Sequence, residues 1–202
     1  MVDWAVCGEP FRGERESGDL HVAADYPGGM LLGVIDGLGH GPEAAAAARA
    51  AAAALTALAG QPVLTLIRAC HEALRSTRGA VMSLAAIDTR HGAMTWAGVG
   101  NVEAVLHRAD PARAPGRERI LLRSGVVGYQ LPPLRATELP LFRGDMLVMV
   151  TDGLKHDFCE EPPLPGPAAA QAELLLRTYS KGTDDALVLT ARYAGVDGSA
   201  AP

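Results

Sequence analysis

The sequence contains few cysteines, and they lack the spacings that give cysteines a structural role. Its 202 residues include three, Cys7, Cys70 and Cys159, which are far apart and odd in number. Because no C-x-x-C pair occurs, we expect neither a disulfide framework nor a cysteine-rich zinc cluster. The three thiols are instead expected to be small buried residues in a reducing compartment.

Targeting features are also missing. The first residues, MVDWAVCGEPFRGERESGD, contain no basic stretch followed by an apolar one. No apolar run approaches the roughly 18 residues that a membrane-spanning helix needs. We therefore expect a cytoplasmic protein without a membrane partner.

Basic residues are neither in excess nor clustered. Eighteen Lys and Arg oppose 23 Asp and Glu, which gives a net charge of -5. Because the basic residues are scattered along the chain, a nucleic-acid partner is not expected. An acidic protein that handles phosphate is expected to do so with bound cations.

The composition is that of an ordinary globular protein. Hydrophobic residues make up 49% and charged residues 20%, close to the average for globular domains. The length suits one compact domain. We expect that domain to span residues 1–194 and to be followed by a disordered tail at 195–202.

Hydrophobic periodicity predicts three helices among many strands. The helices are expected at 42–59, 63–78 and 168–180. Three strands are expected between residues 80 and 108, joined as an antiparallel meander by the turns TRHG and GN. Further strands are expected at 2–7, 19–25, 30–36, 118–123, 135–142, 146–153 and 184–193. Because the order is no regular βαβ alternation, we predict an α+β fold with two antiparallel sheets flanked by helices.

The stretch MLLGVIDGLGHGPEAAAAARAAAAAL, residues 30–55, places an aspartate and alternating glycines between a strand and a helix. Such a turn is typical of dinucleotide binding, but the G-x-G-x-x-G pattern requires a glycine where Pro42 stands. The repeated crossover helices of that fold are missing as well. A nucleotide-binding oxidoreductase is therefore a minor alternative, and it leaves Asp36 unexplained.

Aspartate recurs beside glycine or at a strand end in three other places. These are SGD at Asp19, VTDG at Asp152 and GTDD at Asp184 and Asp185, and VTDG closely resembles VIDG at Asp36. An apolar strand carries a carboxylate to its end, and the glycine opens that point to backbone and solvent. Clustered carboxylates repel one another unless they are neutralised, and their hard oxygens suit Mg²⁺ or Mn²⁺. The pattern predicts a metal site.

Other polar residues are weaker candidates. The six histidines are isolated, and no H-E-x-x-H motif indicates zinc. His40 lies in the glycine turn near Asp36, which makes it a candidate catalytic residue. Arg12 and Arg15 precede SGD and are candidate phosphate ligands, with solvated arginines as the alternative. Asp145, in RGD, is interpreted as a turn residue.

Taken in order, these segments resemble the metal-dependent protein phosphatases of type 2C, and among them the compact bacterial SpoIIE/RsbX-like serine phosphatases. The motifs SGD, DGLGHG, TDG and DD followed by an apolar strand span residues 17–193. GVGNVEA, at 98–104, looks like the RsbX subgroup. The resemblance implies an α-β-β-α sandwich with two divalent metal ions, Mn²⁺ or Mg²⁺, in a cleft at one edge of the sheets.

The resemblance also implies roles for individual residues. Asp36 would bridge both metals and Gly37 would offer its backbone carbonyl, while Asp152 and Asp184 would complete the second metal. Asp19 would be a weak ligand or would engage metal-bound water. The implied mechanism is in-line attack on phosphoserine by a water that bridges the metals. No covalent intermediate is needed, which suits a sequence without a Ser-His-Asp or C-x5-R arrangement.

One position departs from the animal members of the family. These carry histidine directly after the DG pair, where it is thought to protonate the leaving group, whereas this chain has Leu38. The general acid is therefore His40, a metal-bound water or neither. Asp185 is left without an assigned role.

The function implied by the resemblance is hydrolysis of phosphoserine, or of phosphothreonine, on a signalling protein. By analogy the substrate is a phosphorylated scaffold protein of the stressosome type. The alternative within the same fold is a catalytically weak binding or regulatory module, which would not require Mn²⁺.

Overall fold

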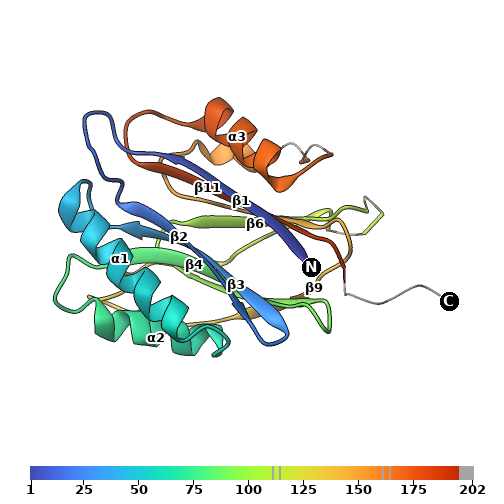
Figure 1. Cartoon of the computed structure of the whole chain (residues 1–202), viewed down its shortest axis with the longest axis horizontal. Helices are drawn as coiled ribbons and strands as arrows, with labels where there is room; N and C mark the ends of the chain where they lie inside the picture. The colour runs from blue at the N-terminus through green and yellow to red at the C-terminus, as the bar shows by residue number, and fades with distance from the viewer. Residues whose placement is uncertain (111, 114, 161, 164, 196–202) are drawn as a thin grey trace.

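The computed structural model describes residues 1–110, 112–113, 115–160, 162–163 and 165–195. Two β-sheets pack face to face, and helices cover both outer surfaces (Figure 1). The predicted α+β class and the α-β-β-α order of layers are confirmed. From residue 196 on, the tail predicted at 195–202 lies outside the described residues.

The first sheet is antiparallel throughout, with β10 in its middle. Its strand order is β1 (Val2–Glu9), β11 (Ala186–Tyr193), β10 (Met146–Val150), β6 (Glu103–His107) and β7 (Arg117–Arg119). Every residue of β10 is buried, because Leu147 and Met149 face the other sheet while Val148 and Val150 face helix α3. The unbroken apolar sequence MLVMV is what such a doubly covered strand requires.

The second sheet has a two-stranded hairpin at one edge, and its other strands are added beside that hairpin. Its strand order is β2 (Asp19–Tyr26), β3 (Gly29–Gly37), β4 (Ala80–Asp88), β5 (Ala93–Val99) and β8 (Leu122–Arg123), with β9 (Thr137–Pro140) also paired to β5. All pairs in it are antiparallel except the short parallel pair β5–β8.

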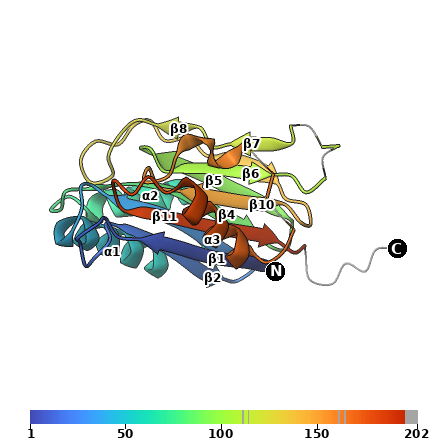
Figure 2. The same ribbon diagram turned by 90° about the horizontal axis from the view of Figure 1, so that it is seen from above.

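Helices α1 (Pro42–Ala57) and α2 (Val63–Ala73) cover the second sheet, and α3 (Ala168–Tyr179) covers the first. Figure 2 shows α3 lying along β1 and β11. Helix α1 begins at Pro42, whose missing N–H costs nothing in a first turn, and Glu43 beside it suits the helix dipole. A short 3-10 turn, His156–Cys159, follows β10.

The second helix is shorter than the predicted 63–78. It ends at Ala73, and Thr77 N–H then donates to Leu74 O in a turn. Gly79, with φ 84°, redirects the chain into β4. The positive φ is readily adopted only by glycine, so Gly79 suits the turn that leads from the segment after the helix into β4.

The predicted meander is wrong at its last connection. β5 and β6 belong to different sheets: β6 pairs with β10 and β7, not with β5. Gly100, with φ 95°, turns the chain across the sandwich. The segment predicted as one strand at 118–123 is likewise divided between β7 and β8, one in each sheet. Both errors arise because strand patterning does not identify a partner strand.

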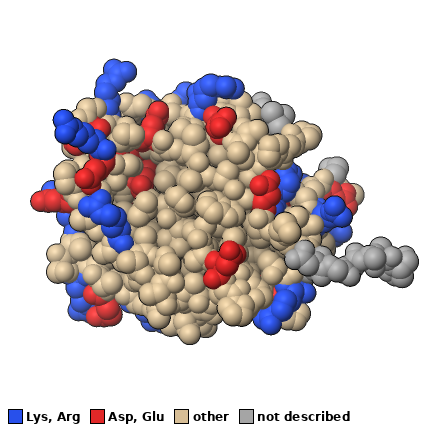
Figure 3. Space-filling model, in the orientation of Figure 1, with Lys and Arg blue, Asp and Glu red and all other residues tan. Residues whose placement is uncertain are grey.

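Charges of both signs are mixed on the surface. On the face in Figure 3, Lys and Arg alternate with Asp and Glu around the margin, and the centre is mostly uncharged. In the described part of the chain, no helix has both the length and the apolarity needed to cross a membrane.

Candidate active site

The structure brings the predicted aspartates to one end of the sandwich, the end at which α1 begins (Figure 1). Asp19, the first residue of β2, is the register partner of Asp36 on β3. In the other sheet, Asp152 follows β10 and Asp184 precedes β11. A pocket of about 430 Å³ opens here, lined among others by Asp36, Asp152 and Asp184.

Close backbone packing explains why glycine follows two of these aspartates. A side chain on Gly37 would place its Cβ 2.2 Å from the carbonyl oxygen of Ala44, at the start of α1. A Cβ on Gly153 would lie 2.0 Å from the carbonyl oxygen of Asp185. Neither approach leaves room for any other residue, so both DG pairs are required by packing as well as by any ligand.

Thr151 joins the two sheets at the site. Its hydroxyl donates to Asp19 Oδ2 at 2.6 Å and accepts from the backbone N–H of Leu187 at 2.9 Å. The contact fixes a carboxylate of one sheet to a strand end of the other. Sequence reasoning missed Thr151, and its place just before the DG pair in VTDG is the only signal for it.

Asp185 organises the loop that precedes β2. Only 3% of its surface is exposed, and its two carboxylate oxygens accept from the backbone N–H groups of Phe11 (2.7 Å) and Gly18 (2.8 Å). Gly18 in turn accepts from Gly37 N–H at 3.0 Å. Asp185 thus holds the loop against the DG turn. This is the role that could not be assigned to Asp185 from the sequence.

Two further side chains hold Asp152. Asn101 Nδ2 donates to Asp152 Oδ2 at 2.7 Å, and Lys181 Nζ donates to the Asp152 carbonyl at 2.6 Å. Asn101 and the neighbouring Gly100 also line the pocket. GVGN forms part of the family resemblance, but nothing in the sequence shows that the chain crossing between the two sheets brings Asn101 to Asp152.

His40 and Leu38 both line the pocket. The Nδ1 atom of His40 lies 2.9 Å from Glu14 Oε1, so the imidazole is tied to the loop before β2. Arg12 and Arg15 lie in the same loop, exposed, and neither is among the residues that line the pocket. The structure therefore brings together His40 and the aspartates, but not the two arginines.

The electrostatics of the site disfavour negative charge. Burial raises the pKa of Asp36 to about 8, with further contributions from the charges of Asp19, Asp152 and Asp184. Burial also raises the pKa of Asp19 to about 7, although the hydrogen bond from Thr151 opposes the shift. Within the described ranges, no hydrogen bond is donated to the Asp36 side chain and no basic side chain forms an ion pair with it. A cation would supply the missing charge.

The residues present fit divalent ions of the hard type. Asp36, Asp152 and Asp184 offer carboxylate oxygens in one pocket, the donors that Mg²⁺ and Mn²⁺ prefer. Among the described residues, no three His, Cys, Asp or Glu side chains form a ready-made set of ligands. Mg²⁺ commonly keeps several waters and uses only one or two carboxylates per ion, so the fit does not require three converging side chains.

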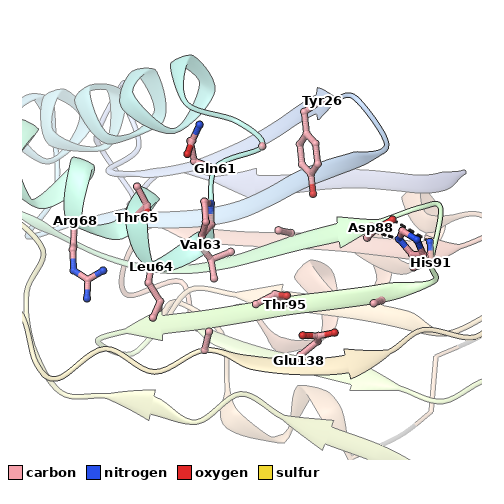
Figure 4. Close-up of a pocket in the computed structure, with 15 residues that line it drawn as sticks. Tyr26, Gln61, Val63, Leu64, Thr65, Arg68, Asp88, His91, Thr95 and Glu138 are labelled. Carbon is pink, nitrogen blue, oxygen red and sulfur yellow. Dashed lines mark hydrogen bonds and ion pairs between the residues drawn. The ribbon is translucent and has the colours of Figure 1, made fainter.

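A larger cavity, of about 710 Å³, lies elsewhere, between the start of α2 and strands β4, β5 and β9 (Figure 4). Its acids, Asp88 and Glu138, lie on different strands, and Asp88 is paired with His91 Nδ1 at 2.8 Å. This cavity has no group of unpaired carboxylates, so we place the candidate chemistry at the aspartate end.

Similar proteins share this architecture. Over 185 residues the chain is 24% identical to the phosphoserine phosphatase RsbX of Bacillus subtilis (strain 168), covering 91% of this chain and 85% of RsbX. One similar solved chain comes from a study of the bacterial stressosome as a modular system adapted to control secondary messenger signalling. It has a TM-score of 0.85 and is 29% identical, and the match covers 95% of this chain and 100% of that chain. RsbX in complex with magnesium has a TM-score of 0.83 and 23% identity over 95% of this chain and 94% of its own.

A family model confirms the resemblance stated from the motifs. Residues 26–178 match the model described as Stage II sporulation protein E (SpoIIE). The match includes Asp36 and Asp152, while Asp19 and Asp184 lie outside it. The dinucleotide-binding alternative does not fit, because β3 and β4 are antiparallel neighbours rather than the parallel strands of that fold. The chain belongs to the family described as Stage II sporulation protein E (SpoIIE).

Proposed function

We propose that this protein is a metal-dependent phosphatase that hydrolyses phosphoserine on a protein. The observation that carries the proposal is the register pair of buried Asp19 and partly buried Asp36, whose pKa values are raised to about 7 and 8 at a pocket that Asp36 lines together with further aspartates. Perturbed carboxylates in a cleft are typical of functional sites. Membership of the SpoIIE family and the similarity to a phosphoserine phosphatase support the reaction.

Two divalent ions, Mn²⁺ or Mg²⁺, would be held by Asp36, the Gly37 carbonyl, Asp152 and Asp184, with Asp19 as a weaker ligand or a partner of bound water. The magnesium in the similar RsbX structure supports this assignment. Such ions supply Lewis-acid chemistry: they lower the pKa of water and neutralise phosphate oxygens.

Neighbouring residues would keep these ligands in place. Asn101 fixes one carboxylate oxygen of Asp152, and Thr151 fixes one of Asp19. The Thr151 hydrogen bond lowers the pKa of Asp19 against the effect of burial, so it favours the charged form that binds a cation. Asp185 acts on these ligands indirectly, through the loop that packs on Gly37.

His40 is the side chain we assign as a candidate proton donor to the leaving serine oxygen. It lines the pocket, and its Nδ1 is engaged by Glu14, so Nε2 is the nitrogen left for a proton transfer. A water in the pocket is the alternative donor. Arg12 and Arg15 remain candidate contacts to phosphate only if the loop that carries them turns towards the pocket.

The substrate we propose is a phosphorylated signalling protein, with a stressosome-type scaffold as the favoured class. The similarity to RsbX and to a chain from stressosome work supports this class. A cytoplasmic location belongs to the same proposal and is supported by the three free cysteines. The proposal also includes a single domain that spans residues 1–194.

Release of phosphate from a phosphoserine peptide tests the proposal. We expect release with Mn²⁺, loss of release in EDTA, and recovery when Mn²⁺ is added back. Full activity after rigorous metal removal would contradict the metal-dependent mechanism. Absence of Mn²⁺ binding to the wild type in calorimetry, with unchanged stability of Asp36→Asn, would instead favour the binding or regulatory module.

A further inference from the structure

A smaller pocket, of about 300 Å³, adjoins the aspartate pocket. Gly100 and Asn101 line both pockets, so they form the wall between them. The remaining lining of this smaller pocket, which we call the side pocket, consists of Glu103, Ala104, Arg119, Ile120, Leu122 and His156. On the aspartate side of the wall, the side chain of Asn101 donates to Asp152. A ligand that extends from the aspartates across this wall therefore enters the side pocket.

At Gly100 the wall consists of backbone alone. Its φ is 95°, and a Cβ on it would lie 2.1 Å from Cγ1 of Val81, so glycine is the residue that fits. The N–H of Gly100 donates to Arg123 O at 2.8 Å, which fixes the wall to the segment that carries the side pocket. Because no side chain projects from Gly100, an extended polypeptide can cross the wall here and place one side chain on each side of it.

The side pocket lies where the chain passes from β7 in one sheet to β8 in the other (Figure 2). The side chains of Ile120 and Leu122 meet over Gly98: a Cβ on Gly98 would lie 3.2 Å from Ile120 Cδ1 and 2.9 Å from Leu122 Cδ2. Ile120 N–H also donates to Ala104 O, on β6, at 2.9 Å. The two half-buried aliphatic side chains and Ala104 form the apolar part of the lining.

The charged residues of the lining are already paired. Glu103 accepts from His156 Nδ1, and its Oε2 lies 3.7 Å from Arg119 Nη1. Arg119 Nη2 also lies 3.0 Å from Glu160 Oε1. A charged ligand group would have to displace one of these partners, whereas an apolar group meets Ile120 and Leu122 without that cost. The lining therefore favours an apolar side chain.

We propose that the side pocket binds one large aliphatic side chain of the phosphoprotein, next in sequence to the phosphoserine that occupies the aspartate pocket. The inference rests on the proposed function and deepens it, because it names the residue class that the substrate carries beside its phosphoserine. A volume of about 300 Å³ is at the lower end for small-ligand pockets and suits one side chain. A phosphorylated chain is favoured over a second copy of this protein, because it matches both adjoining pockets at once.

Three phosphoserine dodecapeptides of equal charge, compared on the full chain with Mn²⁺, test the inference. One has leucines at the two positions before the phosphoserine, one has leucines at the two positions after it, and one has serines at all four. We expect the wild type to prefer one of the leucine peptides over the serine peptide by about ten-fold in kcat/KM, equivalent to about 1.4 kcal/mol. The other leucine peptide should resemble the serine peptide, because the side pocket lies on one side of the aspartate pocket.

Two matched variants place the same charge inside and outside the side pocket. Ile120→Asp should remove the preference by raising KM for the preferred leucine peptide, because a carboxylate replaces part of the apolar lining. Leu121→Asp should retain the preference, since Leu121 is 64% exposed and lines neither pocket. Circular dichroism and hydrolysis of p-nitrophenyl phosphate show whether each variant is folded. If Ile120→Asp does not fold, Ile120→Ala decides, with an expected fall in the preference of about three-fold as part of an aliphatic contact is lost.

Several outcomes would overturn the inference. They are an unchanged preference in the folded Ile120 variant, an equal loss of preference in Leu121→Asp, the same preference for leucines on either side of the phosphoserine, or no preference in the wild type. A wild-type dimer that Ile120→Asp dissociates in sedimentation would overturn it as well, by assigning the apolar lining to a second copy of this chain. Absence of Mn²⁺-dependent hydrolysis of p-nitrophenyl phosphate by the wild type is a different failure, since it would overturn the proposed function itself and the inference with it.

Discussion

The two ends of β10 each carry an aspartate, and their surroundings are opposite. Asp145, just before the strand, has a fully buried side chain that accepts from Arg108 Nη1 at 2.7 Å. It also accepts from the backbone N–H groups of Ala109 (3.0 Å) and Phe142 (3.1 Å). Asp152, just after the strand, lines an open pocket and shares it with other aspartates.

The contrast distinguishes a structural carboxylate from a functional one. At the Asp145 end the protein supplies both the cation and the hydrogen-bond donors, so burial of the charge is compensated. At the other end, Asp152 accepts a hydrogen bond from Asn101, but no basic side chain of the described residues forms an ion pair with its carboxylate. Asp36, on the facing sheet, has neither a donor nor a cation among the described residues, and its pKa is raised to about 8. Residue type alone does not separate Asp145 from Asp152, since each neighbours a glycine in a turn. The presence of a paired cation does.

Asp36→Asn should give the largest effect, at the functional end. We expect kcat for p-nitrophenyl phosphate with Mn²⁺ to fall at least about 1,000-fold, equivalent to about 4 kcal/mol, because a central metal ligand is lost. The fold should be retained, since one of several mutually repelling carboxylates is removed. Steady-state kinetics and circular dichroism measure the two parts, and unfolding of the variant would instead assign Asp36 a structural role.

Asp145→Asn should give the reverse result, at the structural end. The free energy of unfolding in urea is expected to fall by about 3 kcal/mol, because Arg108 stays buried without its main partner. The kcat of the folded variant should not change. Asp110→Asn is the matched control: its ion pair with Arg113 is exposed and should contribute less than about 1 kcal/mol. Equal losses of unfolding free energy in Asp145→Asn and Asp110→Asn would contradict the structural role of Asp145.

A third prediction concerns pH and the metal-free protein. The pKa values of Asp36 and Asp19 are raised from 3.8 to about 8 and about 7. A carboxyl group with a raised pKa favours the folded state at low pH, and that advantage is lost as pH rises through the folded value.

We therefore expect the free energy of unfolding in EDTA to fall by several kcal/mol between pH 5 and pH 8, because each pKa unit by which a group is raised corresponds to about 1.4 kcal/mol. Asp36→Asn should flatten this slope, and Asp110→Asn should not. A free energy of unfolding that rises with pH in the wild type would contradict the raised pKa values of Asp36 and Asp19.

Local features of the fold were predictable from sequence, and long-range pairing was not. Helix α1 and strand β10 follow directly from an alanine-rich segment after Pro42 and from the apolar run MLVMV. The GN turn after β5 was predicted as a hairpin, yet it carries the chain to the other sheet. Two-residue turn signals describe local backbone, whereas the choice of sheet depends on which faces are buried in the assembled sandwich.

The candidate site shows the same difference between local features, which could be predicted, and long-range contacts, which could not. Its aspartates were found because an aspartate beside a glycine or at a strand end is a local pattern. Thr151, Asn101 and Lys181 were missed because their roles arise only when separate strand ends meet. Their partners are 132, 51 and 29 residues away in the chain. Single residues at such separations carry no periodicity or spacing that marks them in advance.

The aspartates of the site are divided between two sheets that are joined mainly by side-chain packing. Asp36 belongs to one sheet and Asp152 to the end of the other, and the layer between them includes Leu32, Val34 and Met149. Their separation is thus fixed by the thickness of a hydrocarbon layer as well as by the hydroxyl of Thr151. The core of this protein acts as a spacer for its site, so a change of one methylene far from the aspartates would also change the gap that the proposed metal ions would fill.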